Sequence, residues 1–205
     1  MKNIFAIMLA VMILTGISFA QIGVMVGANV TNFKGATELN LNTRTGITAG
    51  LYLDFPESGF GFMPSILYSQ KGATFSSSVL EDGVPVNINA TMKYDYIEIP
   101  ILVKYTLETR TSFRPFLLAG PYLGILVSSR MAGTGSSAGV DPITVETDIT
   151  NQRTFDYGFA FGGGIRFDLG NISMNINLRY SIGMIAADKG QLKNSGFSIM
   201  AGLLL

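Results

Sequence analysis

The stretch TFDYGFAFGGGIRFDL, residues 154–169, alternates between large apolar side chains and small or charged ones. Successive side chains of a β-strand point to opposite faces, so this segment would set an aromatic and aliphatic face against a small and charged one. A soluble sheet would bury the apolar face in a core. An outer-membrane barrel would turn the same face to lipid and its polar face to the lumen.

Seven further segments repeat the alternation, which predicts eight strands in total. The connections between them alternate in length, because those after the second, fourth and sixth segments are short. The longer connections are residues 34–44, 73–93, 131–153 and 186–194. Outer-membrane barrels have short periplasmic turns and longer extracellular loops, which matches this asymmetry. The additional segments are residues 21–33, 45–55, 60–72, 94–107, 113–130, 172–185 and 195–205.

Composition favours a membrane protein that crosses with strands. Charged residues make up 14% of the chain, against about 25% in typical soluble domains. No stretch after residue 20 reaches the ~20 apolar residues that a membrane helix needs. We therefore predict an all-β fold, an eight-stranded antiparallel up-and-down transmembrane β-barrel.

The first twenty residues have the pattern of an export signal. Lys2 supplies a positive start, residues 4–14 are apolar, and Ser18 and Ala20 are small residues at the positions that a signal peptidase reads. A membrane anchor is the alternative, but the apolar stretch is short for one. We expect a signal peptide over residues 1–20, a mature barrel domain over residues 21–205, and a location in the outer membrane.

The predicted inward faces carry most of the charges of the strands. An eight-stranded barrel is narrow enough for side chains to fill it, so these charges are expected to pair with one another. A polar path or a ligand site through the lumen is the alternative. The predicted lumen charge network consists of Asp54, Lys71, Glu98, Lys104, Arg114, Arg130, Asp156, Arg166, Asp168 and Arg179.

Two features depart from a simple alternation. Four prolines lie inside predicted strands, where each removes a ladder hydrogen bond, so we expect bulges or local distortions there. Large apolar residues also share the inward parity, so either part of the lumen is an apolar plug or a bulge shifts the parity. The prolines are Pro64, Pro100, Pro115 and Pro121, and the apolar residues are Leu67, Leu102, Phe116, Leu118 and Leu126.

Residues that carry chemistry are few. The chain has no His and no Cys, which removes His-based general bases, thiol nucleophiles and most transition-metal sites. The run Gly162–Gly164 lies inside a strand and lacks the Lys and Ser or Thr of a phosphate-binding loop, so close packing in a narrow barrel explains it better. We expect no enzyme activity, no catalytic residues, no cofactor and no metal. Without Lys2 the net charge is −1, from 13 basic and 14 acidic residues, which gives no reason to expect nucleic-acid binding.

Three blocks resemble the PorT-like outer-membrane beta-barrel family. They read LYSQKG (residues 67–72), YDYIEIPILVKY (residues 94–105) and PFLLAGPYLG (residues 115–124). The resemblance covers essentially the whole mature chain and implies an eight-stranded barrel in the outer membrane of a Gram-negative-type cell. It also implies outer-membrane lipid and the barrel-assembly machinery as partners, the latter during insertion. Some relatives assist a protein-secretion system.

The sequence therefore predicts a non-enzymatic outer-membrane barrel with a side-chain-filled lumen. Its role would be structural, or an interaction through extracellular loops with an extracellular or secretion-system protein. The alternative is a narrow channel or carrier for small solutes or lipids.

Overall fold

The computed structural model describes residues 21–34, 41–55, 59–81, 84–137, 140–149, 152–170, 172–186 and 192–205. The predicted signal peptide, residues 1–20, lies outside the described residues. The described part of the chain is built from β-strands, and it contains no helix long and apolar enough to cross a bilayer. The strands are β1 (Gln21–Lys34), β2 (Leu41–Asp54), β3 (Gly59–Glu81), β4 (Val84–Thr106), β5 (Phe113–Ser137), β6 (Val140–Asp148), β7 (Phe155–Leu169), β8 (Ile172–Ala186) and β9 (Lys193–Leu204).

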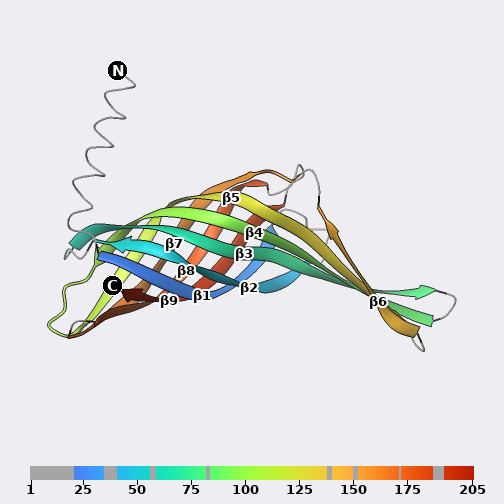
Figure 1. Cartoon of the computed structure of the whole chain (residues 1–205), viewed down its shortest axis with the longest axis horizontal. Helices are drawn as coiled ribbons and strands as arrows, with labels where there is room; N and C mark the ends of the chain where they lie inside the picture. Colours follow the sequence, from blue (N-terminus) through green and yellow to red (C-terminus); the bar gives the residue numbers. More distant parts are fainter. Residues whose placement is uncertain are drawn as a thin grey trace, which may run out of the picture.

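Eight of these strands pair into a closed ring, and Figure 1 shows the barrel from the side. The hydrogen-bonded order runs from β4 through β3, β2, β1, β9, β8 and β7 to β5, and β5 pairs with β4 to complete it. Every pairing is antiparallel, and β6 lies outside the ring, paired with β5 alone. The predicted eight-stranded up-and-down barrel is confirmed.

The two faces of the strands match the predicted parity. On β7, Phe159 and Phe161 are 53% and 50% exposed, whereas Asp156 and Ala160, on the opposite face, are 1% and 6% exposed. A ring with this apolar exterior leaves no free backbone groups toward lipid, because every strand in it has a partner on both sides. The apolar exterior therefore serves as a lipid-facing band.

The turn end of the barrel is compact. Leu169 pairs directly with Ile172, so two residues connect β7 to β8, and Gly170 has a φ of +64°. A left-handed residue of this kind is common in two-residue hairpins. Asn171, the second residue of the predicted turn, lies outside the described residues. The C-terminal end of β9 and the start of β1 lie at this same end, on the left in Figure 1.

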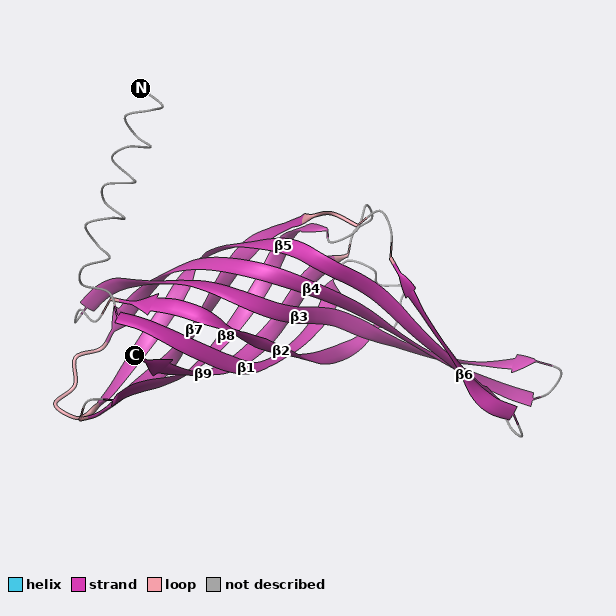
Figure 2. Ribbon diagram, in the orientation of Figure 1, coloured by secondary structure: helices cyan, strands magenta, loops and turns pink. Residues whose placement is uncertain are grey.

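At the opposite end, β3, β4 and β5 continue well beyond the ring, and β6 joins them there (Figure 2). Residues 73–93 and 131–153 were predicted as long loops, and this prediction is wrong for most of them. The pair Ala73↔Met92 continues rung by rung to Glu81↔Val84, and Arg130 pairs with Asp148 at the base of β6. These strands form what we call the projecting sheet, residues 76–89 and 131–148.

The sequence concealed the projecting sheet because its strands are rich in Ser, Thr and Asn. Ser76, Ser78, Asn87 and Asn89 stand on neighbouring positions of β3 and β4. A sheet that stands in water needs no continuous apolar face, so the alternation that marks membrane strands is weak there. The polar composition resembled that of loops, although each of these strands is paired with a neighbouring strand.

Pro64 and Pro100 lie at a gap in the β3–β4 ladder that does not shift its register. The β3–β4 pairs stop at Pro64↔Ile101 and resume in the same register at Leu67↔Glu98. A true bulge lies elsewhere, in β5, where Asp95 pairs with Ser128 and Tyr96 pairs with Leu126. Val127 is the additional residue. The expected local distortion is present at Pro64 and Pro100, whereas the β5–β7 ladder continues through Pro115 and Pro121. The parity shift is at Val127.

A test of the faces is Leu178→Arg. Leu178 lies in the middle of β8 and is 52% exposed on the outer face. Arg at the bilayer midplane should lower the free energy of unfolding by about 2–4 kcal/mol, and by about 0–1 kcal/mol near an interface. Urea titration in lipid vesicles measures the difference, with Leu169→Arg at the turn end as the matched control. Equal losses at the two positions would contradict the assigned membrane band.

Candidate functional site

A layer of charges fills the lumen at the turn end. Asp54 of β2 accepts hydrogen bonds from Lys104 of β4 and from Arg166 of β7, the latter at 3.1 Å. Arg166 also donates to Asp168 at 2.8 Å, and Arg114 lies 3.3 Å from the other oxygen of Asp168. Asp54 is 2% exposed. One buried carboxylate thus holds two cations from different strands.

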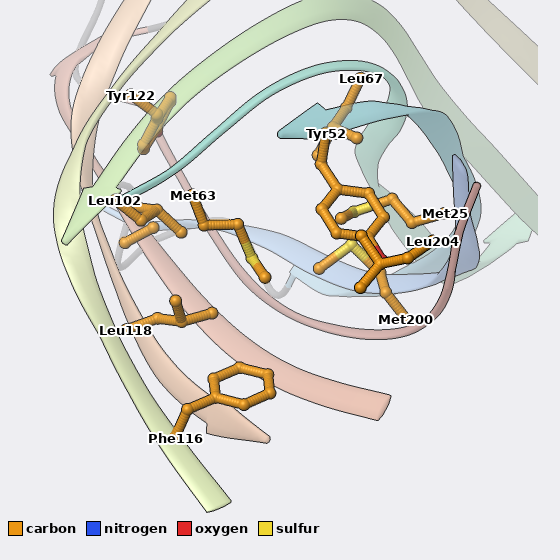
Figure 3. Close-up of a cluster of buried hydrophobic side chains, with 11 residues drawn as sticks. Met25, Tyr52, Met63, Leu67, Leu102, Phe116, Leu118, Tyr122, Met200 and Leu204 are labelled. Carbon is orange, nitrogen blue, oxygen red and sulfur yellow. The ribbon is translucent and has the colours of Figure 1, made fainter. Parts of the chain in front are cut away.

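An apolar layer seals the lumen above these charges (Figure 3). Leu102, Phe116 and Leu118 project from β4 and β5 toward Met63 and the opposite wall. Gly164 makes room for the Phe116 ring, because a methyl group at Gly164 would lie 2.6 Å from Phe116 Cζ. The plug predicted from the inward parity is confirmed, and the close-packing role predicted for this glycine run is confirmed with it.

Arg179 lies in the middle of the bore, 4% exposed. Its guanidinium donates toward the sulfurs of Met63 and Met25, at 3.4 and 3.9 Å. No ion pair of Arg179 is present among the described residues. A cavity of about 30 Å³ is lined by Glu98, Arg179 and several hydroxyl groups, which is room for one or two water molecules. We expect water there to bridge the two charged groups.

A second charge layer lies toward the loop end. Lys71 Nζ lies 2.5 Å from Glu98 Oε1 and 3.7 Å from Asp156 Oδ2. Asn194 and Tyr122 donate to the same Asp156 oxygen at 2.9 and 3.3 Å. The ammonium also lies 4.7 Å from the centroid of the Tyr122 ring. Burial makes each of these charges dependent on its partners, so the layer ties β3, β4, β7 and β9 together.

An aromatic cluster closes the bore beyond this layer. Phe33, Ala73, Tyr94 and Tyr96 are buried together, and the rings of Phe33 and Tyr94 meet edge to face with centroids 5.4 Å apart. Leu126, which was assigned to the lumen by parity, packs partly buried against the same cluster. Between the two ends, the described residues therefore alternate charged and apolar layers.

Two of the predicted lumen charges are not inside the bore. Arg130 is a correction: its side chain is 56% exposed and lies 3.7 Å from Asp148 on β6. The bulge at Val127 reverses the parity of β5 just before Arg130. Arg114 has the predicted parity but stands at the mouth, with 47% of its side chain exposed. The remaining predicted residues line the lumen: Asp54, Lys71, Glu98, Lys104, Asp156, Arg166, Asp168 and Arg179.

Sequence reasoning missed two neutral residues of the network. Asn194 bridges Asp156 and the hydroxyl of Tyr96. Tyr52 accepts a hydrogen bond of 2.7 Å from Asn175 deep in the bore. Inward parity was the only signal for Tyr52, and Asn194 lay in the predicted connection 186–194, although the structure places it in β9. Within the described ranges no cluster of carboxylates could hold a metal ion.

The projecting sheet has two unlike faces. Ile88 pairs with Gly135, which pairs with Ile143, so these residues share one face. Ile143 and Val145 on β6 are 67% and 60% exposed on it. The other face is polar and bears the cross-strand ion pairs Lys93–Glu146, at 3.5 Å, and Arg130–Asp148, at 3.7 Å.

A closed eight-stranded ring with an apolar exterior and a filled lumen defines a small outer-membrane β-barrel. A family model described as outer membrane protein beta-barrel domain matches residues 15–188. The chain belongs to this family. No relative was found among curated protein sequences.

Solved structures with a similar fold share little sequence with this chain. Ail of Yersinia pestis, in complex with the heparin analogue sucrose octasulfate, is 16% identical, with 91% of this chain and 99% of Ail covered and a TM-score of 0.46. Neisserial surface protein A is 10% identical, with 90% and 97% covered and a TM-score of 0.45. The N-terminal barrel domain of Pseudomonas aeruginosa OprF is 12% identical, with 91% and 99% covered and a TM-score of 0.37.

The turn-end layer generates a stability prediction for Asp54→Asn. The variant leaves Lys104 and Arg166 buried without their shared carboxylate, so we expect a loss of about 3–5 kcal/mol in the free energy of unfolding. Asp148→Asn is the matched control. It breaks an ion pair whose carboxylate side chain is 86% exposed, and the loss should be below about 1 kcal/mol. Urea titration in vesicles measures both, and a loss as small at Asp54 as at Asp148 would refute the role of this layer.

Proposed function

We propose that this protein is a non-enzymatic outer-membrane barrel that presents its projecting sheet outside the cell to a protein partner. The observation that carries the proposal is the continuation of β3, β4 and β5 beyond the ring, with β6 added at their edge. The end with the sheet is assigned to the outside because outer-membrane barrels keep short turns in the periplasm.

The outer edge of β6 supplies a means of binding. This strand pairs with β5 on one side and is the last strand in the sheet order. Among the described residues no strand pairs with its other side, so backbone groups there can pair with an added strand. Its sequence also includes Pro142 and three acidic residues, Asp141, Glu146 and Asp148. Proline and charge discourage self-pairing at an edge. Glu146 and Asp148 are paired with Lys93 and Arg130, so Asp141 is the acidic residue that favours a basic side chain on the partner strand.

The sealed lumen supports an anchoring role for the barrel. Two charged layers, an apolar plug and an aromatic cluster lie in series along it. Their packing stabilises the ring, and they occupy the space that a solute would need. The barrel then acts as a rigid support, and recognition is left to the sheet.

Three further elements belong to this proposal. The chain is exported through a signal peptide over residues 1–20, which is removed before the barrel inserts with the help of the assembly machinery. It is a PorT-like member of its family, as the blocks at residues 67–72, 94–105 and 115–124 indicate. The partner of the sheet is an extracellular protein or a component of a protein-secretion system.

Single cysteines test the proposed orientation and the role of the sheet, because the natural chain has none. Thr144→Cys on β6 should react with a membrane-impermeant maleimide in intact cells, whereas Arg110→Cys in the β4–β5 turn should not. A photo-crosslinker at Thr144→Cys should give discrete protein adducts in cells that express the natural partners.

The control is a trimmed barrel that lacks most of the projecting sheet. Each deletion begins and ends beside two residues that pair with each other. Ser76 pairs with Asn89, and Gly133 pairs with Val145, so short turns can replace residues 77–88 and 134–144 without disturbing the ring. In the full barrel, a crosslinker at Arg110→Cys should give no protein adducts. In the trimmed barrel, a crosslinker at Lys93→Cys should also give no protein adducts. Labelling of Arg110→Cys alone in intact cells would overturn the orientation, and adducts that persist in the trimmed barrel would overturn the role of the sheet.

A narrow channel is the second candidate, and the small cavity lined by Glu98 and Arg179 is the observation that favours it. We nevertheless expect no sustained ion conductance in planar bilayers, because the plug and the paired charges leave no continuous aqueous path. Reproducible current steps in the wild type that disappear in Glu98→Gln would move the protein to the channel class.

A further inference from the structure

Two lysines stand directly opposite each other on the outer surface at the loop end of the barrel. Lys34, the last residue of β1, pairs with Lys193, the first residue of β9. Both side chains are exposed, and within the described residues neither has an ionic partner. Like charges directly opposite on antiparallel strands repel each other. The arrangement is therefore favourable where an anion lies between them.

The pair lies at the height of lipid headgroups. The apolar outward residues of β1 run from Ile22 to Val30, about 26 Å along the strand at about 3.3 Å per residue. The rung Val30↔Phe197 is the last apolar one on β1 and β9, and Asn32↔Ser195 and Lys34↔Lys193 follow it. Lysines just beyond the apolar band face the polar headgroup layer of the loop-side leaflet.

Tyr180 holds one ammonium group at that height. Lys34 Nζ donates a 2.7 Å hydrogen bond to Tyr180 Oη and lies 5.4 Å from the centroid of its ring. The Tyr180 ring stacks against Phe197 and Phe161, with centroids 4.6 and 5.4 Å apart. Since the Tyr180 oxygen accepts from Lys34, its own proton is left to donate to a second oxygen atom. The Lys34 ammonium and the Tyr180 hydroxyl thus lie together, and the exposed Lys193 side chain leaves the strand on the same rung as Lys34.

An apolar surface continues directly below these donors. Phe161 and Phe197 are about half exposed on the lipid face, and Leu178 and Ile199, which pair with each other, are 52% and 57% exposed one rung further into the band. A free phosphate would use the donors alone. A phosphorylated lipid would use both parts, with its headgroup on the lysines and its acyl chains along the aromatic and aliphatic residues.

We propose that Lys34, Lys193 and Tyr180 form a binding site for the phosphate headgroup of an outer-leaflet lipid. The inference rests on the proposed orientation, which assigns the loop end to the outer leaflet. A bound phosphate neutralises the cross-strand repulsion and fixes the junction between the first and last strands. It also sets the depth of the barrel at the base of the projecting sheet.

The test uses the purified full-length mature barrel in a zwitterionic detergent, with lipid A as the probe and native mass spectrometry as the readout. Lysines near an anionic lipid surface contribute about 1 kcal/mol each, so Lys34→Gln and Lys193→Gln should each weaken binding about five-fold and the double variant about 25-fold. Tyr180→Phe, which keeps the ring but removes the hydroxyl donor, should also weaken it. The control is Lys93→Gln, below the base of the projecting sheet on β4, which should bind as the wild type does.

Two competing ligands identify the source of the phosphate. Dephosphorylated lipid A should bind the wild type as weakly as intact lipid A binds the double variant, and inorganic phosphate at the same concentration should not displace lipid A. Unchanged binding by the double variant, equal binding of the dephosphorylated lipid, or displacement by inorganic phosphate would each overturn the proposal. Lipid A binding in detergent does not depend on the orientation of the barrel in cells. Maleimide labelling in intact cells tests that orientation separately, so failure of the lipid site can be told apart from failure of the proposed function.

Discussion

The structure depends on one constraint, that no backbone group facing hydrocarbon can remain without a hydrogen-bond partner. The ring satisfies it by pairing β4 with β5 and β1 with β9. Closure with eight strands fixes a narrow bore, and a narrow bore places inward charges within a few ångströms of the opposite wall. Asp54 therefore meets both Lys104 and Arg166, although they lie on separate strands. The lumen network is a consequence of closure as much as of composition.

The faces of the outward residues could be predicted from the sequence, whereas the contacts between lumen residues could not, because different constraints set them. Lipid imposes a period of two on every membrane strand, so the faces of residues such as Phe161 and Leu178 were predictable. Lumen pairs depend on the stagger of the strands around the ring, which no single segment encodes. The sequence indicated that Lys71 and Asp156 share the lumen, but their 3.7 Å contact depends on how β3 and β7 are set within the closed ring.

The two errors of the sequence reading share a physical origin. Parity arguments assume an unbroken strand, and the additional residue Val127 breaks β5 just before Arg130, so this side chain points away from the bore. Outside the membrane the constraint from lipid ends. Strands there keep their backbone pairing but lose the apolar alternation, so Ser76–Asn89, a paired hairpin, resembled a loop. The errors therefore begin where the lipid band ends.

That boundary is also where the molecule changes role. Within the band the barrel pairs its own backbone and most of its lumen charges, Arg179 excepted, which leaves little for a partner to bind. Beyond it, β6 presents a free edge and the rung Lys34↔Lys193 presents two like charges without an internal counter-ion among the described residues. Within the described residues, the outer edge of β6 lacks hydrogen-bond partners and the lysine pair lacks a counter-ion. A barrel whose lumen is filled and whose rim keeps an unpaired edge and two like charges has its binding capacity at that rim, which is where both proposals, a lipid at the base of the sheet and a protein on it, are placed.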